Sequence, residues 1–275
     1  MIVVIEKKHM VKYKSKIMQI KCLIFLLFST IVFSQNKAIV PTKGAIVFKK
    51  LEIISDVEKY KKSMGAMSSK MVDFQIEKEL MDNLMKPNVD STEINELKQT
   101  LKSIIEEDLN QDIENKDLKY YQIFKKQLIV NYQTFNDNTY ENYKIIDTYK
   151  NTLKIVDKDS ITIISDNVNY QYSQDEVIEI NEFREETKKI NNFKCFKVIL
   201  LFKPNYNEDD EFENFMNKYI HKRELWVTDK IKCTYHPIEN HKEIITKYYP
   251  LEIIESNEVI EGHFINYATI LFSIK

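Results

Sequence analysis

The fold class of this chain is decided by the stretch Phe193-Lys-Cys-Phe-Lys-Val-Ile-Leu-Leu-Phe202. Its apolar residues fall at both odd and even positions, so a strand formed here is apolar on both faces and belongs in the centre of a sheet. The chain from Tyr120 to its end is rich in Ile, Val, Tyr, Phe and Thr and is divided by clusters of Asn and Asp. Short strands at such frequent spacing, with no helices between them, predict an antiparallel meander over 119–275.

Further strands are expected from β-branched and aromatic runs that are bounded by turn residues. They cover 44–54, 120–135, 143–156, 160–164, 168–172, 177–183, 223–228, 230–235, 243–248, 250–255 and 263–274. The segment 205–221 is too charged for a strand, and we expect a solvated loop there with a short helix around 212–219. Its acidic run Glu208-Asp-Asp-Glu-Phe-Glu213 lacks the ligand spacing and the turn glycine of a calcium loop.

Between Ser55 and Leu118, apolar residues recur near i, i+3, i+4 and i+7, which is the spacing of a helical face. This spacing predicts a helical insertion over 55–118. Pro87-Asn88 divides this region into two amphipathic helices, and Asp90 or Ser91 is the expected N-cap of the second. The first helix has an apolar stripe rich in methionine, which either covers the sheet as ordinary core or offers an adaptable surface to apolar ligands. Core packing is the simpler interpretation of this stripe, which comprises Met64, Met67, Met71, Phe74, Leu80, Met81, Leu84 and Met85.

Residues Lys12 to Gln35 have the pattern of a secretory signal peptide, with lysines before an apolar run from Cys22 to Phe33. About 12 apolar residues form roughly 18 Å of helix, which is short of the ~30 Å hydrocarbon core of a membrane. An uncleaved anchor is the alternative. We expect cleavage of residues 1–34 on export, which leaves 35–275 as a single α+β domain that does not span the membrane. It would act in the periplasm, at the outer membrane or outside the cell.

Composition argues against several classes of function. The 275 residues include 40 Lys plus Arg and 42 Asp plus Glu, and the net charge of -2 provides no basic surface for nucleic acid. Only 3 glycines occur, Gly44, Gly65 and Gly262. Phosphate loops, dinucleotide fingerprints and nucleophile elbows need glycine where the backbone turns sharply or approaches a ligand. Nucleotide-dependent enzymes and α/β-hydrolases are therefore not expected, and no cofactor is predicted.

Two cysteines, Cys195 and Cys233, follow the signal peptide. In an oxidising compartment they form either a disulfide or two buried thiols in neighbouring strands, and both alternatives stay open. Cys233, His236 and His241 have the spacing Cys-x2-His-x4-His, which resembles part of a zinc site. A fourth ligand has no motif support and Pro237 excludes a helical presentation, so no metal is predicted.

No catalytic residue is predicted either. No serine lies in a nucleophile elbow, neither cysteine has a recognisable His and Asn partner, and no carboxylate pair is singled out for glycoside hydrolysis. The aromatic residues, 16 Tyr, 15 Phe and one Trp, are the remaining candidates for a binding site. They form either the core of the fold or the lining of an apolar cleft. Alternation places Trp226 on the face opposite Leu225 and Val227.

Four short segments occur in the order in which one family carries its landmarks. They are Gly44-Ala-Ile-Val-Phe48, Glu186-Thr-Lys-Lys-Ile-Asn-Asn-Phe-Lys-Cys195, Glu224-Leu-Trp-Val-Thr-Asp-Lys-Ile231 and Tyr249-Pro-Leu-Glu-Ile-Ile254. The chain thereby resembles the GLPGLI proteins, secreted proteins of unknown function that are common in Bacteroidetes. It departs from them at Asn192, where the family has glycine, and at the hexapeptide, where only Pro250 and its apolar neighbours match. The resemblance implies export and a sheet similar to the curved half-barrels of lipoprotein carriers, and it implies no activity.

We therefore expect an α+β fold in which a curved, half-barrel-like antiparallel sheet carries the helical insertion packed on one face. The expected function is non-enzymatic binding, with an apolar groove between sheet and helices as the site. The expected partner is an apolar ligand or an outer-membrane or envelope protein. An extracellular hydrolase that uses paired carboxylates or the cluster of Cys233, His236 and His241 is the alternative.

Overall fold

The computed structural model describes residues 38–81, 91–113, 117–205 and 219–275. The chain divides into two units, Met1–Ile39 and Val40–Lys275, and the fold described here is that of the second unit. The predicted signal peptide, the break at Pro87-Asn88 and the acidic run 208–213 lie outside the described residues. Within those residues, no helix is both long and apolar enough to cross a membrane.

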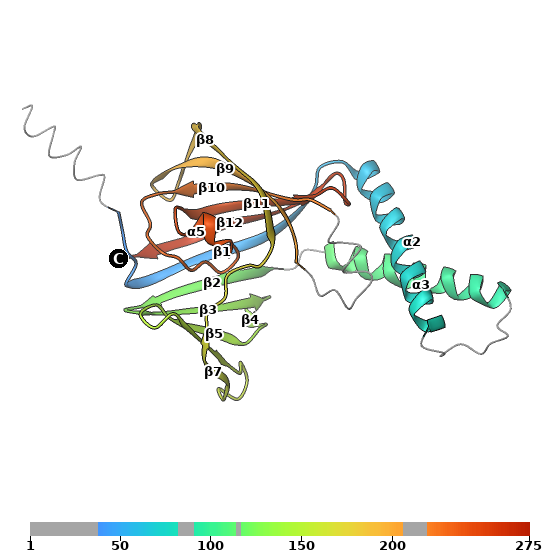
Figure 1. Ribbon diagram of the computed structural model, residues 1–275, viewed down its shortest axis with the longest axis horizontal. Helices are drawn as coiled ribbons and strands as arrows, with labels where there is room; N and C mark the ends of the chain where they lie inside the picture. The colour runs from blue at the N-terminus through green and yellow to red at the C-terminus, as the bar shows by residue number, and fades with distance from the viewer. Residues whose placement is uncertain (1–37, 82–90, 114–116, 206–218) are drawn as a thin grey trace, which may run out of the picture. The chain divides into compact units, whose positions relative to one another are not determined.

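A curled antiparallel sheet forms most of this unit (Figure 1). Its strands are ordered β7-β6-β5-β3-β2-β1-β12-β11-β10-β9-β8, and β4 pairs with β3. β1 pairs with both β2 and β12, so the first and last strands meet in the middle of the sheet. The strands are β1 Lys43–Ile54, β2 Leu118–Lys125, β3 Leu128–Phe135, β4 Asn138–Thr139, β5 Tyr143–Asp147, β6 Thr152–Val156, β7 Ile163–Asn169, β8 Glu176–Ile190, β9 Phe193–Lys203, β10 His221–Thr228, β11 Tyr249–Asn257 and β12 His263–Ile274.

Two long helices, α2 (Val57–Met81) and α3 (Ser91–Ile113), are inserted between β1 and β2. α2 begins after Asp56, whose carboxylate accepts a hydrogen bond from the third backbone N–H of the helix. Its first turn contacts the sheet where the ring of Tyr60 lies 5.6 Å from that of His263. The predicted class, an α+β fold with a curved antiparallel sheet and a helical insertion, is confirmed. The methionines of the predicted stripe that the structure describes are half-buried: Met64, Met67 and Met71.

Chain connectivity explains why the sheet curls. Its two edge strands, β7 and β8, are consecutive in the chain and are joined only by residues 170–175, which we call the crossing segment. In a flat sheet, the spacings of about 4.8 Å between neighbouring strands would place these edges roughly 48 Å apart. The connection from Asn169 to Glu176 can span at most about 25 Å. The sheet therefore curls until its edges approach each other, and the crossing segment runs over the concave side (Figure 1).

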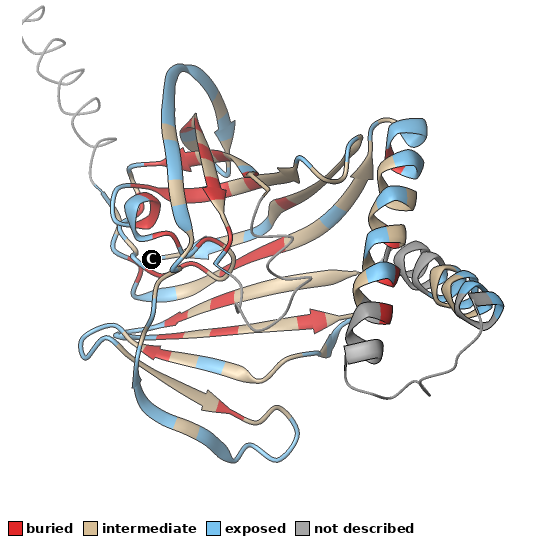
Figure 2. Cartoon of the chain, turned by 45° about the vertical axis from the view of Figure 1, so that its right-hand side comes forward, coloured by how far each residue is buried: buried red, intermediate tan, exposed pale blue. Residues whose placement is uncertain are grey.

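The concave side is filled by the connection between β10 and β11, residues 229–248, which we call the inner segment. It includes the short helix α5 (Lys242–Ile245) and meets the crossing segment where the Ser173 N–H donates to the Asn240 carbonyl at 3.0 Å. Two core clusters each combine side chains of the inner segment with side chains of the strands. Buried residues therefore lie on the strands and on the inner segment (Figure 2). Buried residues of the inner segment are Ile231, Tyr235, His236, Glu239, His241, Ile244, Ile245 and Tyr248.

The inner segment corrects two strand predictions. Residues 230–235 form no ladder beyond a single bridge at Ile231, and 243–248 contain α5 and a turn. Neighbouring Ile244 and Ile245 are both buried, a pattern that a helical turn produces between two core surfaces and an alternating strand does not. Strand predictions therefore failed where the chain leaves the sheet and packs on it.

Other strand predictions were right in kind but wrong in position. The expected strands 120–135 and 143–156 are each a hairpin, because Lys126 and Asn151 turn the chain with φ of 58° and 55°. Strands expected at 160–164 and 168–172 are replaced by β7. The expected central strand, β9, is paired on both sides but lies next to the edge, and β1 holds the middle.

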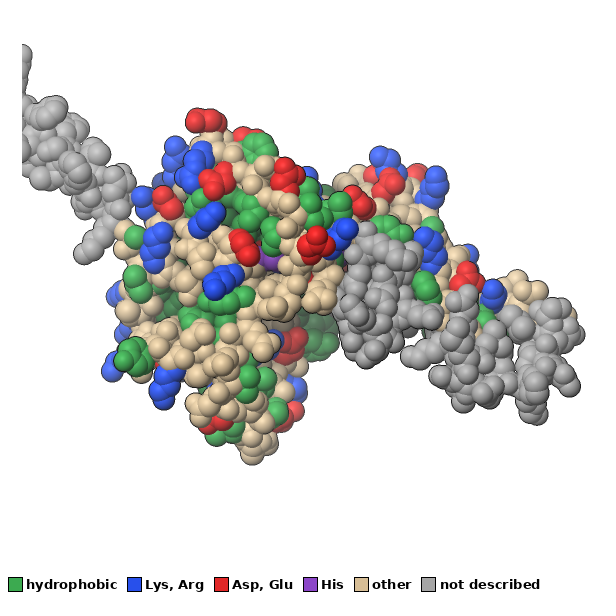
Figure 3. All heavy atoms as spheres, viewed as in Figure 1, with side chains coloured by type: hydrophobic (Ala, Val, Ile, Leu, Met, Phe, Trp, Pro, Cys, Tyr) green, Lys and Arg blue, Asp and Glu red, His purple; other side chains and the backbone are tan. Residues whose placement is uncertain are grey.

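Charged side chains of both signs are interspersed on the face of the molecule shown in Figure 3. This distribution agrees with the balance of 40 basic and 42 acidic residues. Long-range attraction of a highly charged partner is accordingly weak on that face, and binding there depends on local groups.

Candidate functional site

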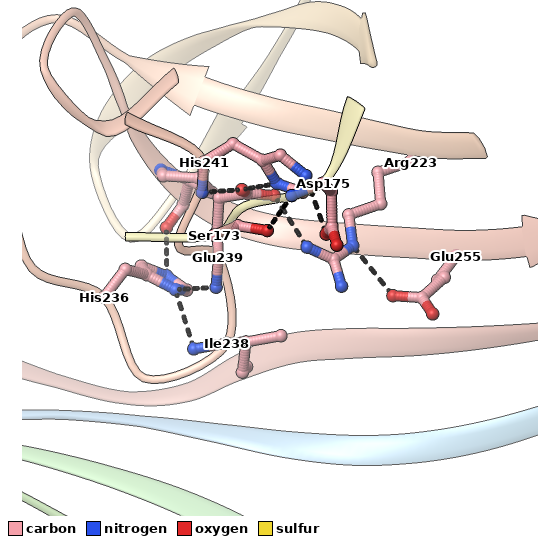
Figure 4. A network of polar contacts seen from close by, with 9 residues as sticks. Ser173, Asp175, Arg223, His236, Ile238, Glu239, His241 and Glu255 are labelled. Atoms are coloured by element: carbon pink, nitrogen blue, oxygen red, sulfur yellow. Dashed lines mark hydrogen bonds and ion pairs between the residues drawn. The ribbon is translucent and has the colours of Figure 1, made fainter. Parts of the chain in front are cut away.

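Five charged side chains connect the inner segment, the crossing segment and the sheet, and we call them the polar network (Figure 4). His241 lies with Nδ1 2.6 Å from Glu239 Oε1 and Nε2 3.2 Å from Asp175 Oδ2. Arg223 of β10 lies 3.2 Å from the other oxygen of Glu239 and 2.8 Å from Glu255 of β11. The network therefore ties the crossing segment to the inner segment and to the two strands that flank it, β10 and β11.

Burial and partners together set the charge of this network. Burial opposes the charge of Glu239, but the positive charge of Arg223 and the hydrogen bond from His241 outweigh it and lower the pKa of Glu239 to about 2. Burial also opposes a charge on His241, which is 1 % exposed, but its contacts with Asp175 and Glu239 raise its pKa to about 9. Both side chains are charged at neutral pH. Carboxylates lie beside both ring nitrogens, so His241 joins the inner segment to the crossing segment.

The residues of the Cys-x2-His-x4-His pattern do not meet at one point. His236 accepts backbone N–H groups of Ile238 and Glu239 at Nδ1 and donates from Nε2 to the Pro250 carbonyl at 3.2 Å. Burial lowers the pKa of His236 to about 3, so its ring is neutral. No group of three or more His, Cys, Asp or Glu among the described residues is arranged to hold a metal. The zinc alternative, and with it the metal version of the hydrolase, therefore has no ligand set here.

Both cysteines are free thiols in the structure. Cys233 donates to the Tyr235 carbonyl at 3.1 Å, and Cys195 donates to the Phe193 carbonyl at 3.8 Å. Burial raises the pKa of both thiols to about 12, which keeps them protonated and unreactive at neutral pH. Cys195 is a buried thiol of β9, whereas Cys233 is half-buried and lies in the inner segment, so the structure has two separate thiols that are not in neighbouring strands.

A cavity of about 540 Å³ lies between the β2–β3 turn and the inner segment. Its floor consists of buried core side chains, Phe124, Ile129, Ile231 and Ile245. Three exposed lysines also line it, and none of the lining residues is an aspartate or glutamate. Within the described part of the chain, these lysines make no ion pair. We call this site the lysine-rimmed cavity, after Lys126, Lys232 and Lys247.

A second cavity, of about 340 Å³, is lined by β3, β5, the crossing segment and the inner segment. Six of its lining residues carry a carboxamide, and we call it the amide cleft after them: Asn131, Gln133, Asn142, Asn169, Gln171 and Asn240. No residue of α2 or α3 lines either cavity. Both cavities therefore lie against the inner segment and not in the groove that the sequence suggested between sheet and helices.

No model of a known protein family, no curated protein and no solved structure matches this chain. Function is therefore inferred from the geometry of the molecule itself.

The alternation of side chains along β10 correctly predicted the face on which Trp226 lies, and it also shows that Arg223 must be buried. Leu225 and Val227 are buried whereas Trp226 is half-buried on the opposite face, as predicted, with Lys188 Nζ 4.2 Å from its ring centre. The same alternation puts Arg223 on the buried face of β10, where an arginine requires a buried carboxylate. That position predicts a partner such as Glu239, although the sequence does not identify which acid it is.

Proposed function

We propose that this chain is an exported, non-enzymatic binding protein and that its ligand is an amphiphile held in the lysine-rimmed cavity. The observation that carries the proposal is the combination of a buried apolar floor with three lysines and no carboxylate in one cavity. Its 540 Å³ lies within the roughly 300 to 1,000 Å³ that small-molecule sites occupy. An apolar chain would displace water from the floor, and an acidic headgroup would neutralise the exposed lysines.

Export rests on the pattern of residues 12–35, and the inferred membership of the GLPGLI family supports it. Three of the four landmarks lie on the adjoining strands β8 to β11, and the remaining landmark is at the start of β1. Asn192, which stands where the family has glycine, has φ of 70° in the two-residue β8–β9 turn. Asparagine tolerates this left-handed conformation better than most residues, so the departure preserves the turn.

The test is displacement of 1-anilinonaphthalene-8-sulfonate, a fluorescent probe with apolar rings and a sulfonate, from the purified chain that begins at Gln35. We expect the probe to bind and palmitate to displace it. Hexadecanol has the same chain length without the acidic group, so we expect it to displace the probe about tenfold less well, which corresponds to roughly 1.4 kcal/mol.

Two matched variants locate the ligand. Thr234→Trp places a large ring at an exposed lining position and is expected to abolish displaceable binding, whereas Thr100→Trp, at an exposed site on α3, is expected to leave it unchanged. Equal binding by both variants would contradict the proposed site. A native chain that captures an envelope protein but shows no displaceable probe would instead favour the protein-partner alternative.

A further inference from the structure

We propose that the amide cleft is a second and independent binding site, and that its ligand is a neutral saccharide. The structure brings six carboxamide side chains from β3, the β4–β5 connection, the end of β7, the crossing segment and the inner segment to one cavity against the concave side of the sheet. The inner segment is distant in the sequence from the others, so its Asn240 joins the group only when the sheet curls.

The cleft offers no net charge to a ligand. Its charged lining residues other than histidine are Glu141 and Lys144, which lie 3.7 Å apart and neutralise each other. His236 also lines the cleft, but backbone groups occupy both of its ring nitrogens. A ligand that matches this lining is therefore uncharged and gains its affinity from hydrogen bonds and contact with apolar surface.

The hydrogen-bonding capacity of the cleft is largely unused. Of the six carboxamide side chains, only that of Asn142 hydrogen-bonds to the described protein, where it accepts the Lys158 N–H at 3.1 Å. Each carboxamide presents both donors and an acceptor. A sugar hydroxyl also donates and accepts, so a ring with several hydroxyls matches a wall of carboxamides group by group.

Asn131 is the side chain that points most directly to a ligand. It lies between Ile129 and Gln133 on the inward face of β3, is 8 % exposed and lines the cleft. Its Oδ1 atom is buried and has no hydrogen-bond partner among the described residues. A buried acceptor without a partner destabilises the fold. A turn of the carboxamide that brings Oδ1 into the cleft would allow a ligand hydroxyl to donate to it and would remove this cost.

Aromatic and aliphatic side chains complete the cleft. Tyr170 packs edge-to-face on Tyr235 with ring centres 4.9 Å apart, and Tyr120 packs on Tyr267 at 5.6 Å. The third lining tyrosine, Tyr132, stacks on Tyr121 with ring centres 4.6 Å apart, so all three are held by a second ring and offer apolar surface to the C–H groups of a sugar. At 340 Å³ the cleft is at the small end of ligand sites, which suits one or two sugar units.

A peptide is the other ligand class that carboxamides recognise, and the position of the cleft argues against it. Extended peptides usually bind by adding a strand to a free sheet edge. β3 is paired with β2 and β5, and β5 is paired with β3 and β6, so their backbone groups are already in use. Of the edge strand β7, only the last two residues, Val168 and Asn169, line the cleft, which is too short a stretch to pair with an added strand. Recognition on this face is left to side chains, which suits a compact ring better than a chain.

The test measures maltose, cellobiose and lactose by saturation-transfer NMR on the chain that begins at Gln35, together with retention on an array of neutral glycans. We expect at least one of the three disaccharides to bind with a dissociation constant of about 1 mM or tighter. Asn131→Leu keeps the branching and the number of heavy atoms of the side chain and removes the unpaired acceptor. We expect it to weaken this binding at least about tenfold while the urea midpoint of unfolding stays equal or rises.

Controls separate this site from the lysine-rimmed cavity and from a structural role of Asn131. Asn181→Leu, at an exposed position of β8, and Thr234→Trp, in the other cavity, should leave saccharide binding unchanged, whereas Gln171→Ala at an exposed lining position should weaken it. Absence of any saccharide signal would overturn the proposal. So would a loss of stability without a loss of binding in Asn131→Leu, or binding of neutral peptides in place of glycans.

Discussion

The fold requires glycine at position 262 but not at position 65. Gly262 has φ of 73°, and a Cβ there would lie 2.4 Å from the Asp56 carbonyl oxygen. Its own carbonyl accepts backbone N–H groups of Ser55 and Asp56, which anchors the start of α2 to the β11–β12 turn. Gly65 lies inside α2 with open space where a Cβ would be.

A matched pair of substitutions tests this contrast. We expect Gly65→Ala to raise the free energy of unfolding by about 0.5 to 1 kcal/mol, since alanine loses less backbone entropy in a helix. We expect Gly262→Ala to lower it by about 2 kcal/mol or more, through the left-handed backbone and the clash with Asp56. Urea unfolding monitored by far-UV circular dichroism measures both. Shifts of the same sign would contradict the assignment of these two roles.

Asparagine and aspartate occupy most of the turn positions that glycine would usually take. The residues other than glycine with positive φ are Lys126, Asn136, Asp137, Asn151, Ile161, Asn167, Asn191 and Asn192. The clusters of Asn and Asp therefore predicted where many strands end, although β8 continues to Ile190, beyond the strand predicted over 177–183. At Lys126 the sequence has no turn residue, which explains why the β2–β3 hairpin was predicted as one strand.

At the scale of elements, the inner segment was the part least accessible from sequence. Its apolar residues resemble those of short strands, yet its backbone direction is set by groups elsewhere: Gln122 of β2 donates to the Tyr235 carbonyl at 2.9 Å, and His236 donates to the Pro250 carbonyl. Such long-range contacts override local propensity. Since both candidate cavities are walled by this segment, they could not be predicted before the fold was known.

The polar network should hold the inner segment through Arg223 and Glu239. Arg223→Met leaves Glu239 buried without its main counter-charge, and we expect a loss of about 3 to 5 kcal/mol in the free energy of unfolding. The double variant with Glu239→Gln should recover a large part of that loss, because the fully buried side chain at position 239 no longer carries an unpaired charge. A double-mutant cycle by urea unfolding measures the coupling.

The control for this cycle is Lys98→Met, which breaks the pair with Asp73 between α3 and α2, where the two side chains are 41 % and 57 % exposed. Exposed pairs contribute about 0 to 1 kcal/mol, so we expect only a small effect. Additive losses in the Arg223 and Glu239 cycle would show that the two charges do not stabilise each other.

For the whole molecule, the connection between the two edge strands determines the shape of the sheet. The chain passes from one edge of the sheet to the other through the crossing segment, so the curvature of the sheet, the approach of its edges and the polar network arise together. Strand propensities predicted an antiparallel sheet, and the family resemblance implied its curvature. Strand order depends on which strands pair, and no local pattern in the sequence specifies that.

Two buried histidines on the inner segment should give the fold a stability maximum near pH 6.5. His241 has its pKa raised from 6.5 to about 9, so its contribution is complete below about pH 6.5 and is lost as the pH rises through 9. His236 has its pKa lowered from 6.5 to about 3, so protonation of the unfolded chain increasingly disfavours folding as the pH falls below 6.5. Glu239, with a pKa of about 2, adds to the acid loss below about pH 4.5.

The loss of stability above pH 6.5 can be assigned to one residue, His241. We expect the free energy of unfolding of the unmodified chain to fall by roughly 2 to 3 kcal/mol between pH 6.5 and pH 9, because a pKa difference of one unit corresponds to about 1.36 kcal/mol. His241→Gln removes the titrating group between Asp175 and Glu239, and its stability, although lower at pH 6.5, should change little over that interval. Urea unfolding in steps across this range measures both. If the two proteins lost stability in parallel, a group other than His241 would control the alkaline side.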